Sequence, residues 1–245
     1  MKSLVNRRIL AVIFDLDNTL IQSKKGARQG LRTVARIFAK RLNQEGLHYS
    51  EANLFRRLRL IDSEMHGRKF LYNRDVWWET LLTEISASNI VGFWIHKATL
   101  RYWETYARSS PLFSDTMTTI RRIKKAGFRI AMVSDSDGTP GMKMKRILQQ
   151  PFLKYLETIV VAGEDTPGVK PSKAPFTLVA ERLRLRPRDC VYIGDNPNTD
   201  VKGAKGAGML MILIKRRGPE GGRPDYLAHS LSDAAKLLIR AQAQA

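Results

Sequence analysis

The residues best suited to chemistry are two aspartates, Asp15 and Asp17, which follow an apolar run in the stretch "AVIFDLDNTLI". Two like charges one residue apart repel each other, and each carboxylate loses hydration near a protein core. A buried strand therefore rarely ends in this way unless a metal, a reaction or a turn accounts for the pair. Aspartate is also common in turns, so the pair alone does not decide between these explanations.

Short apolar runs rich in Val and Ile supply the elements that must position this pair. They have the length of buried strands, and they cover residues 8–14, 128–134, 157–163, 189–195 and 209–215. Helix-like stretches lie between the later runs, among them "TMTTIRRIKKAG", with Asp115 as its predicted N-cap and Gly127 as its stop. This alternation predicts an α/β fold, a Rossmann-like parallel sheet with helices on both faces.

Residues 22–106 interrupt the alternation with long amphipathic stretches and no comparable strand run. All four tryptophans of the chain lie in this segment: Trp77, Trp78, Trp94 and Trp103. We expect an all-helical domain inserted after the first strand, with the tryptophans in its core. Residues 1–21 and 107–245 are then the two parts of the α/β core.

Polar residues follow several of the predicted strands, where an open parallel sheet binds its ligands. They are Asp15, Asp17, Thr19, Ser134, Lys170, Asp195 and Asp200. Carboxylates of this kind suit Mg²⁺, which takes one or two of them together with a phosphate oxygen. One aspartate could attack phosphorus and a second could exchange the proton, while an ammonium group offsets the negative charge. The pattern predicts phosphoryl chemistry at this edge of the sheet.

The same residues give the chain a recognisable likeness. "FDLDNTL" resembles the first motif of the haloacid dehalogenase (HAD) superfamily, and Ser134 and Lys170 match the second and third. "GDNPNTDVKGAKGAGM" is similar to the fourth motif, and the likeness covers residues 8–21 and 108–240 in family order. Because Asp17 is present, the chain resembles the phosphatase branch, with a helical cap after the first motif as in phosphoglycolate phosphatase-like members.

The resemblance implies a catalytic role for each motif. Asp15 would be the nucleophile, Asp17 the general acid and base, and Lys170 the group that stabilises an aspartyl phosphate. It implies Mg²⁺ as cofactor, held by the side chain of Asp15, the backbone carbonyl of Asp17 and the side chain of Asp195.

Further residues take supporting roles in the same comparison. Ser134, with the amide of Asp135 and with Lys170, would bind the phosphate group. Asp200 and Thr19 would support the metal ligands without touching the metal, and Asp200 could also orient Lys170. A simple N-cap for the helix that begins near Val201 is the other interpretation of Asp200.

The inserted segment resembles the family's cap, which closes over the site, excludes water and selects the substrate. Arg74 and Lys69 are candidate substrate contacts in it. Long basic side chains more often lie on solvated faces, which is the competing interpretation of both.

These observations predict a Mg²⁺-dependent phosphomonoester hydrolase that acts on a small phosphorylated metabolite through an aspartyl phosphate. One alternative is a phosphotransferase of the β-phosphoglucomutase type, which uses the same motifs. Another is a basic protein that binds nucleic acid or an acidic partner on a HAD scaffold. The complete set of motif residues argues against this last alternative.

The charge of the chain is the feature that favours that last alternative. The 245 residues hold 42 Lys and Arg against 23 Asp and Glu, a net charge of +19. The basic residues are dispersed, in small groups at 24–28, 56–59, 121–125, 143–146, 182–188 and 215–217. Because no run reaches the length of a basic tail, we expect no nucleic acid as the main partner.

Composition also sets expectations about the environment of the protein. The one cysteine, Cys190, excludes an intramolecular disulfide, and no stretch reaches the roughly 20 apolar residues of a membrane span. We expect a cytoplasmic protein without a membrane partner, either a monomer or a homodimer.

Overall fold

The computed structural model describes residues 8–67, 73–88, 92–216 and 222–244. The chain forms two compact units. The α/β unit contains the chain up to Ile21, Leu112–Ser136 and the chain from Lys143 onward, and the helical unit contains Gln22–Pro111 and Asp137–Met142. No helix within the described residues has the length and apolar character that crossing a membrane requires.

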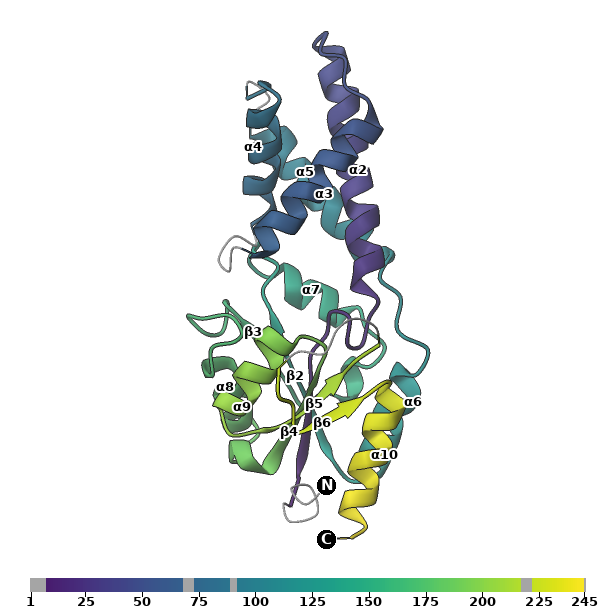
Figure 1. Ribbon diagram of the computed structural model, residues 1–245, viewed down its shortest axis with the longest axis vertical. Coiled ribbons are helices and arrows are strands. Elements are labelled where there is room, and N and C mark those ends of the chain that lie inside the picture. The colour runs from purple at the N-terminus through teal and green to yellow at the C-terminus, as the bar shows by residue number, and fades with distance from the viewer. Residues whose placement is uncertain (1–7, 68–72, 89–91, 217–221, 245) are drawn as a thin grey trace. The chain divides into compact units, whose positions relative to one another are not determined.

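The α/β unit is built on one sheet of six parallel strands in the order β3-β2-β1-β4-β5-β6 (Figure 1). The strands are β1 Ala11–Phe14, β2 Arg129–Asp135, β3 Thr158–Ala162, β4 Cys190–Gly194, β5 Leu210–Ile214 and β6 Tyr226–Ala228. Four of them lie within the apolar runs of the sequence, β2 extends one residue beyond its run, and β6 is a short strand at one edge. The predicted Rossmann-like α/β class is confirmed.

Side chains of β1 alternate between two apolar clusters, one on each face of the sheet. Val12 and Phe14 pack in one cluster with residues of α6 Thr116–Lys125 and α10 Leu231–Gln242. Ala11 and Ile13 pack in the other cluster with residues of α8 Ala174–Arg182 and α9 Lys202–Gly206, on the opposite face of the sheet (Figure 1). A further helix, α7 Met142–Leu148, contributes Ile147 to the first cluster.

Register brings the carboxyl ends of the three central strands together. Phe14, the last residue of β1, pairs with Met132 of β2 and with Ile193 of β4. The residues that follow β1, β2 and β4 therefore lie at one edge, which is where the motif residues occur.

The α/β unit also contains short turns, namely the 3₁₀ turns Leu153–Tyr155 and Pro187–Asp189 and the π turn Pro197–Val201.

The helical unit consists of α2 Ser23–Gln44, α3 Glu51–Gly67, α4 Arg74–Glu84 and α5 Phe93–Arg108. Trp77, Trp78 and Trp103 are buried in its apolar cluster, as expected, whereas Trp94 is only partly buried against it. Helices α2 and α5 approach closely near Gly26, where a Cβ atom would lie 2.5 Å from the carbonyl oxygen of Tyr106. Only glycine permits that approach.

Asp115 lies at the N-cap position of α6, but its side chain makes no capping hydrogen bond there. Its carboxylate instead accepts hydrogen bonds from the backbone N–H groups of Leu231 and Ser232, at 2.8 and 3.3 Å, in the first turn of α10. Arg216 completes the contact with an ion pair of 3.2 Å. The prediction that Asp115 caps its own helix is therefore wrong: it caps a helix that begins more than a hundred residues later.

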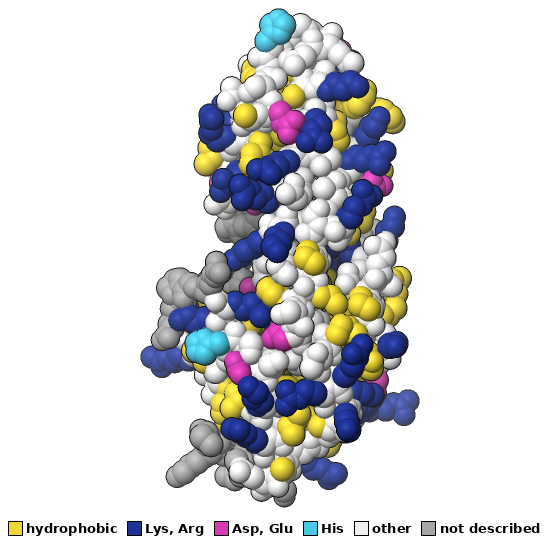
Figure 2. All heavy atoms as spheres, turned by 90° about the vertical axis from the view of Figure 1, so that its right-hand side faces the viewer, with side chains coloured by type: hydrophobic (Ala, Val, Ile, Leu, Met, Phe, Trp, Pro, Cys, Tyr) yellow, Lys and Arg dark blue, Asp and Glu magenta, His cyan; other side chains and the backbone are white. Residues whose placement is uncertain are grey.

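Basic side chains are spread over the face of the molecule drawn in Figure 2. Figure 2 shows Lys and Arg scattered across the face in view, with far fewer Asp and Glu among them. Exposed members on α2 include Arg28, Arg36 and Lys40. The dispersion agrees with the sequence pattern.

Candidate active site

Asp15 and Asp17 lie in the tight turn that follows β1. The backbone N–H of Asp15 donates to the carbonyl of Ile193 at 2.9 Å, which fixes the end of β1 against β4. Asn18 has a φ of 60°, a left-handed conformation that asparagine tolerates better than most residues. The turn closes where the N–H of Asn18 donates to the carbonyl of Ile21 at 2.9 Å. The two aspartates are therefore held by a defined backbone rather than by a mobile loop.

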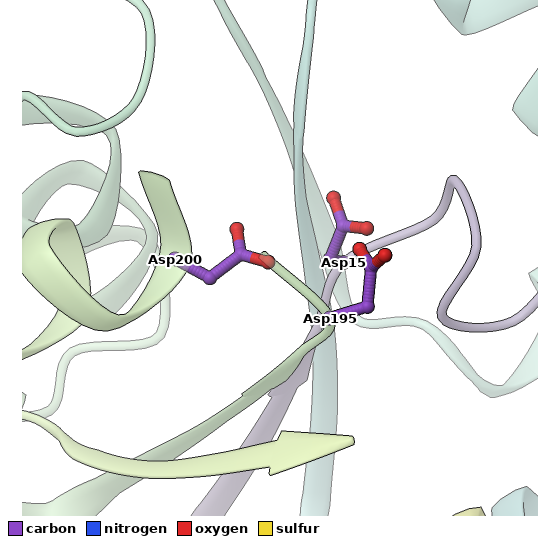
Figure 3. A group of neighbouring side chains, drawn as sticks. All are labelled: Asp15, Asp195 and Asp200. Atoms are coloured by element: carbon purple, nitrogen blue, oxygen red, sulfur yellow. The ribbon is translucent and has the colours of Figure 1, made fainter. Parts of the chain in front are cut away.

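Three carboxylates meet at this edge of the sheet. Oxygen atoms of Asp15, Asp195 and Asp200 all lie within 4.8 Å of one another. Figure 3 shows Asp15 and Asp195 side by side, while Asp200 extends toward them from a neighbouring helical turn. Burial raises the pKa of Asp15 to about 7, and the negative charge of Asp200 adds to the effect against the opposing charge of Lys170.

Lys170 is the cation at the centre of this group. Its Nζ donates to Oδ1 of Asp15 at 2.8 Å and to Oδ1 of Asp200 at 2.7 Å, and its side chain is 4% exposed. Burial alone would lower the pKa of Lys170, but the two carboxylates raise it well above its ordinary value. The residue is therefore a permanent positive charge beside the predicted nucleophile.

Tyr192 lies beneath Lys170 and was not identified from the sequence. Its hydroxyl oxygen accepts a hydrogen bond from Nζ of Lys170 at 3.3 Å and donates to the carbonyl of Val133 at 3.0 Å. Its ring packs edge-on against Phe176 with centroids 4.9 Å apart. Tyr192 thus limits the positions that the Lys170 ammonium can adopt.

Asp200 does not cap the helix that follows it. Its Oδ2 accepts from the backbone N–H of Asn196 at 3.0 Å, and Asn196 is itself the N-cap of the turn. A Cβ atom at Gly194 would lie 2.3 Å from Oδ2 of Asp200, so only glycine leaves room for this carboxylate. Asp200 is instead a partner of Lys170, one of the two roles that the resemblance implied.

Ser134 and Asp135 end β2 at the same edge, and Ser134 is 2% exposed. Oδ1 of Asp135 accepts a hydrogen bond from the backbone N–H of Lys170 at 2.9 Å. Burial raises the pKa of Asp135, although the nearby charge of Lys170 opposes that effect. The side chain of Asp135 therefore fixes the loop that carries Lys170, in addition to the predicted role of its amide.

Asp17 has two basic partners, both on α7. Lys143 forms an ion pair with its Oδ2, and Nη2 of Arg146 lies 2.7 Å from its Oδ1. Burial acts to raise the pKa of Asp17, but the charges of Arg146 and Lys143 outweigh it and hold the pKa well below its ordinary value. The motif predicts a side chain that exchanges a proton, whereas the structure shows a carboxylate held in its ionised form by two cations.

Thr19 is fully buried in the turn after Asp17. Among the described residues its hydroxyl has no hydrogen-bond partner. A buried hydroxyl without a partner is costly, and a ligand or water at the edge of the sheet would satisfy it.

The two predicted substrate contacts have different outcomes. Arg74 is buried in the helical unit, with its guanidinium 3.3 Å from the ring centroid of Trp77 and 3.8 Å from Asp62. These contacts give Arg74 a packing role in that unit, and its contact with substrate stays a prediction. Lys69 lies outside the described residues.

Lys143 and Arg146 were also missed, because the sequence placed them among the dispersed basic groups. Their spacing of three residues on a helix sets both on one face, but only the fold shows that this face meets Asp17. Tyr192 could have been singled out in the sequence only as a polar aromatic residue inside an apolar strand, which is a weak indication of a functional role.

The donor set fits a divalent cation. Oxygen ligands alone suit Mg²⁺, and the crowding of Asp15, Asp195 and Asp200 leaves negative charge that a cation would neutralise. Burial, and to a lesser extent the negative charge of Asp200, raises the pKa of Asp15, and a bound cation would oppose both effects.

Comparison with known proteins finds phosphatases among the relatives of this chain. A glyceraldehyde 3-phosphate phosphatase from Methanopyrus kandleri is 28% identical over 212 residues, which cover 85% of this chain and 84% of the relative. A ribulose-1,5-bisphosphate 5-phosphatase from Halopiger xanaduensis is 26% identical and covers 83% of this chain and 84% of its own.

A crystal structure of a HAD phosphatase from Thermococcus onnurineus has the same fold. It matches with a TM-score of 0.68 at 24% identity and covers 94% of this chain and 98% of its own. The family model of the haloacid dehalogenase-like hydrolases matches residues 9–208, a range that includes every motif residue of the site. The chain therefore belongs to the haloacid dehalogenase-like hydrolase family.

Proposed function

We propose that the protein is a Mg²⁺-dependent phosphatase that hydrolyses a small phosphorylated metabolite through an aspartyl phosphate on Asp15. The observation that carries the proposal is the ammonium of Lys170 between Asp15 and Asp200, beside a third carboxylate. A nucleophile, a fixed cation and a cation site at one strand edge are what phosphoryl transfer requires. The phosphatase names of the relatives support the same reaction.

Each residue has a defined task in this proposal. The carboxylate of Asp15 attacks phosphorus, and Lys170 offsets the negative charge that gathers on the two groups. Ser134 and the amide of Asp135 hold the phosphoryl oxygens. In this proposal Asp17 is the general acid toward the leaving oxygen and then the base toward the attacking water, which requires its ion pairs with Lys143 and Arg146 to weaken when substrate binds.

The metal site of the proposal contains the side chains of Asp15 and Asp195 and the backbone carbonyl of Asp17. Bound Mg²⁺ would neutralise the carboxylates and draw electron density from the phosphoryl oxygens. Asp200 and Thr19 support this shell, Asp200 through its contact with Lys170.

The inserted segment, residues 22–106 in the sequence, is in this proposal the cap that selects the substrate. Relatives named for glyceraldehyde 3-phosphate and for ribulose 1,5-bisphosphate support a short sugar phosphate or a related acid phosphate as the substrate class. A cytoplasmic location, a monomeric or homodimeric state and the absence of a nucleic-acid partner stay predictions. The mutase alternative uses the same residues and differs only in where the phosphoryl group goes.

A substrate screen tests the proposal directly. Purified protein with Mg²⁺ is offered a panel of phosphorylated metabolites, and released inorganic phosphate is measured to give kcat/KM for each. We expect phosphate release from several alkyl phosphates without any bisphosphate activator. Transfer of phosphate within a hexose phosphate, with no release, would support the mutase instead, and no turnover of any phosphomonoester would contradict the proposal.

Metal binding gives a second test that does not depend on activity. We expect saturating Mg²⁺, at about 100 times its Kd, to stabilise the protein by roughly 2.7 kcal/mol at pH 8, a rise in Tm of about 5–10 °C. At pH 5 the rise should be smaller, because the pKa of Asp15 is raised to about 7 and the protonated carboxyl is a poor ligand.

The sign of this pH effect follows from the raised pKa. The folded protein binds the proton of Asp15 more tightly than the unfolded chain, so the metal-free protein loses stability as pH rises from about 4 to 7. Mg²⁺ offsets that loss at pH 8. An equal shift of Tm at both pH values, or a full shift in Asp195→Asn, would contradict the metal assignment; NaCl at matched ionic strength is the control.

A further inference from the structure

Helix α2 carries a high concentration of positive charge. Its 22 residues include seven Lys and Arg and no Asp or Glu. Five of the seven occur at every fourth position, and we call them the basic row: Lys24, Arg28, Arg32, Arg36 and Lys40. Residues four apart are neighbours on one face of a helix, so the basic row forms a line along α2 that is about 24 Å long.

The basic row lies on the exposed side of α2. Arg32 is half-buried and the other four members are exposed. The apolar residues of α2, among them Val34 and Phe38, pack in the core of the helical unit. Helix α2 lies at the right-hand side of this unit in Figure 1, and Figure 2, which shows that side, has many more Lys and Arg than Asp and Glu on the unit.

Acidic side chains compensate little of this charge. Arg36 forms an ion pair of 3.2 Å with Glu51 of α3. Within the part of the chain that the structure describes, no ion pair involves Arg28, Arg32 or Lys40. Like charges four residues apart destabilise a helix, so the basic row lowers the stability of α2 when no anion is bound to it.

Helix α3 extends the positive surface. The guanidinium of Arg32 lies 5.2 Å from the ring centroid of Phe55 on α3. The ion pair of Arg36 is one step of four residues further along α2 and one step earlier along α3, so the two helices are antiparallel. One step in the other direction brings Arg28 level with Arg59, which is exposed. The position opposite Arg28 is therefore basic, not acidic.

We propose that the basic row and Arg59 form a surface that docks onto the phosphate backbone of duplex DNA, independently of base sequence and of the reaction at Asp15. Duplex DNA carries one negative charge per roughly 1.7 Å of its axis, so a straight line of cations can contact several phosphates at once. Three members of the basic row are arginines, whose guanidinium groups bind phosphate through two parallel hydrogen bonds.

Other anionic partners fit this surface less well. Proteins that bind single-stranded nucleic acid stack its bases on aromatic side chains, whereas Phe55, the ring in contact with the basic row, is half-buried beneath Arg32. Helices that bind a membrane surface insert an apolar face, and the apolar face of α2 is packed inside the helical unit.

The sequence analysis expected no nucleic acid as the main partner because it considered contiguous basic runs. Basic residues four positions apart form no such run, and they gather on one face only because residues 23–44 are helical. In the proposal duplex DNA is an additional partner beside the small phosphorylated substrate.

Fluorescence anisotropy of a labelled DNA duplex tests the proposal with the full-length protein. We expect a Kd of roughly 1–100 µM near physiological salt and a steep loss of affinity as the salt concentration rises. The test variant combines Arg28→Gln, Lys40→Gln and Arg59→Gln. Its affinity at low salt should fall by roughly 10-fold or more, and the slope of log Kd against log salt should fall by about 3, one unit for each lost phosphate contact. Its Tm should equal or exceed that of the wild type, because like charges are removed.

The matched control removes the same charge from α6 of the α/β unit. It combines Arg121→Gln, Arg122→Gln and Lys125→Gln, all at exposed positions. Its affinity should stay within about 3-fold of the wild type, because contacts with the phosphates and not net charge carry the binding. A second variant, Arg28→Lys with Arg59→Lys, keeps the charge and should retain most of the affinity.

Four outcomes would overturn the docking surface. Failure of the wild type to bind the duplex at about 100 µM in low salt would exclude it. Wild-type affinity in the test variant would mean that the basic row makes no contact with DNA. An equal loss in the α6 control would mean that only net charge matters. Tighter binding to single-stranded DNA, to anionic lipid vesicles or to polyglutamate would assign the surface to a different partner. The phosphatase proposal is tested separately by the substrate screen and does not depend on these results.

Discussion

Asp15→Asn is expected to abolish phosphatase activity while leaving the fold intact. The amide cannot attack phosphorus, and loss of a nucleophile costs roughly 10³-fold or more in kcat. Burial raises the pKa of Asp15, so at pH 8 the ionised carboxylate is an unfavourable group and a neutral amide should not weaken the metal-free fold. We expect the Tm in EDTA to equal or exceed that of the wild type.

Two measurements check this expectation. The first is kcat on p-nitrophenyl phosphate and on the best substrate of the screen. The second is covalent label retained on acid-quenched protein after incubation with ³²P-labelled substrate, which should be present in the wild type and absent in the variant. Glu181→Gln, at an exposed position of α8, is the control for loss of one negative charge. Wild-type turnover in Asp15→Asn would show that another residue is the nucleophile.

Lys170→Met is expected to damage both catalysis and stability. Removing the ammonium leaves the carboxylates of Asp15 and Asp200 buried without it, and breaking a buried pair in this way costs about 3–5 kcal/mol. The loss of one preorganised charge beside the phosphoryl group should lower kcat by roughly 10²–10³-fold.

Thermal unfolding and steady-state kinetics test the two effects separately. The expected fall in Tm is roughly 6–20 °C in EDTA and smaller with Mg²⁺, because the metal would compensate the same carboxylates. Lys173→Met, at an exposed position three residues away, should leave both quantities unchanged. If Lys170→Met kept its Tm but lost activity, Lys170 would contribute to catalysis without stabilising the site.

The sequence predicted the sheet and the motif residues because both signals are local. Each apolar run is rich in Val and Ile and has the length of one strand. The motif residues that directly follow a run must lie at the end of that strand because they are adjacent to it in the chain. The structure brings Asp15, Lys170 and Asp200 within hydrogen-bonding distance and Asp195 beside them, as expected for one edge of a parallel sheet.

The sequence did not predict the long-range contacts that join distant parts of the chain. The partner of Asp115 is α10, and the partners of Asp17 lie on α7; in both cases the contact joins residues more than a hundred positions apart. Periodicity and capping rules consider only near neighbours, so they assigned Asp115 to its own helix and left the basic pair on the surface. The long-range pairing of charges could be found only once the strand order was known.

The point at which the helical segment leaves and rejoins the sheet has a consequence for the order of folding. The backbone N–H of Gln22 donates to the carbonyl of Pro111 at 2.8 Å, and Ile21 forms a bridge with Leu112. Strands β1 and β2 pair in the sheet, but the whole helical segment from Gln22 to Pro111 separates them in the chain. Closing so long a loop before the strands can pair is slow and entropically unfavourable. If the helical segment folds first, its two ends, Gln22 and Pro111, are already close together. Strands β1 and β2 can then pair as if only a short turn joined them.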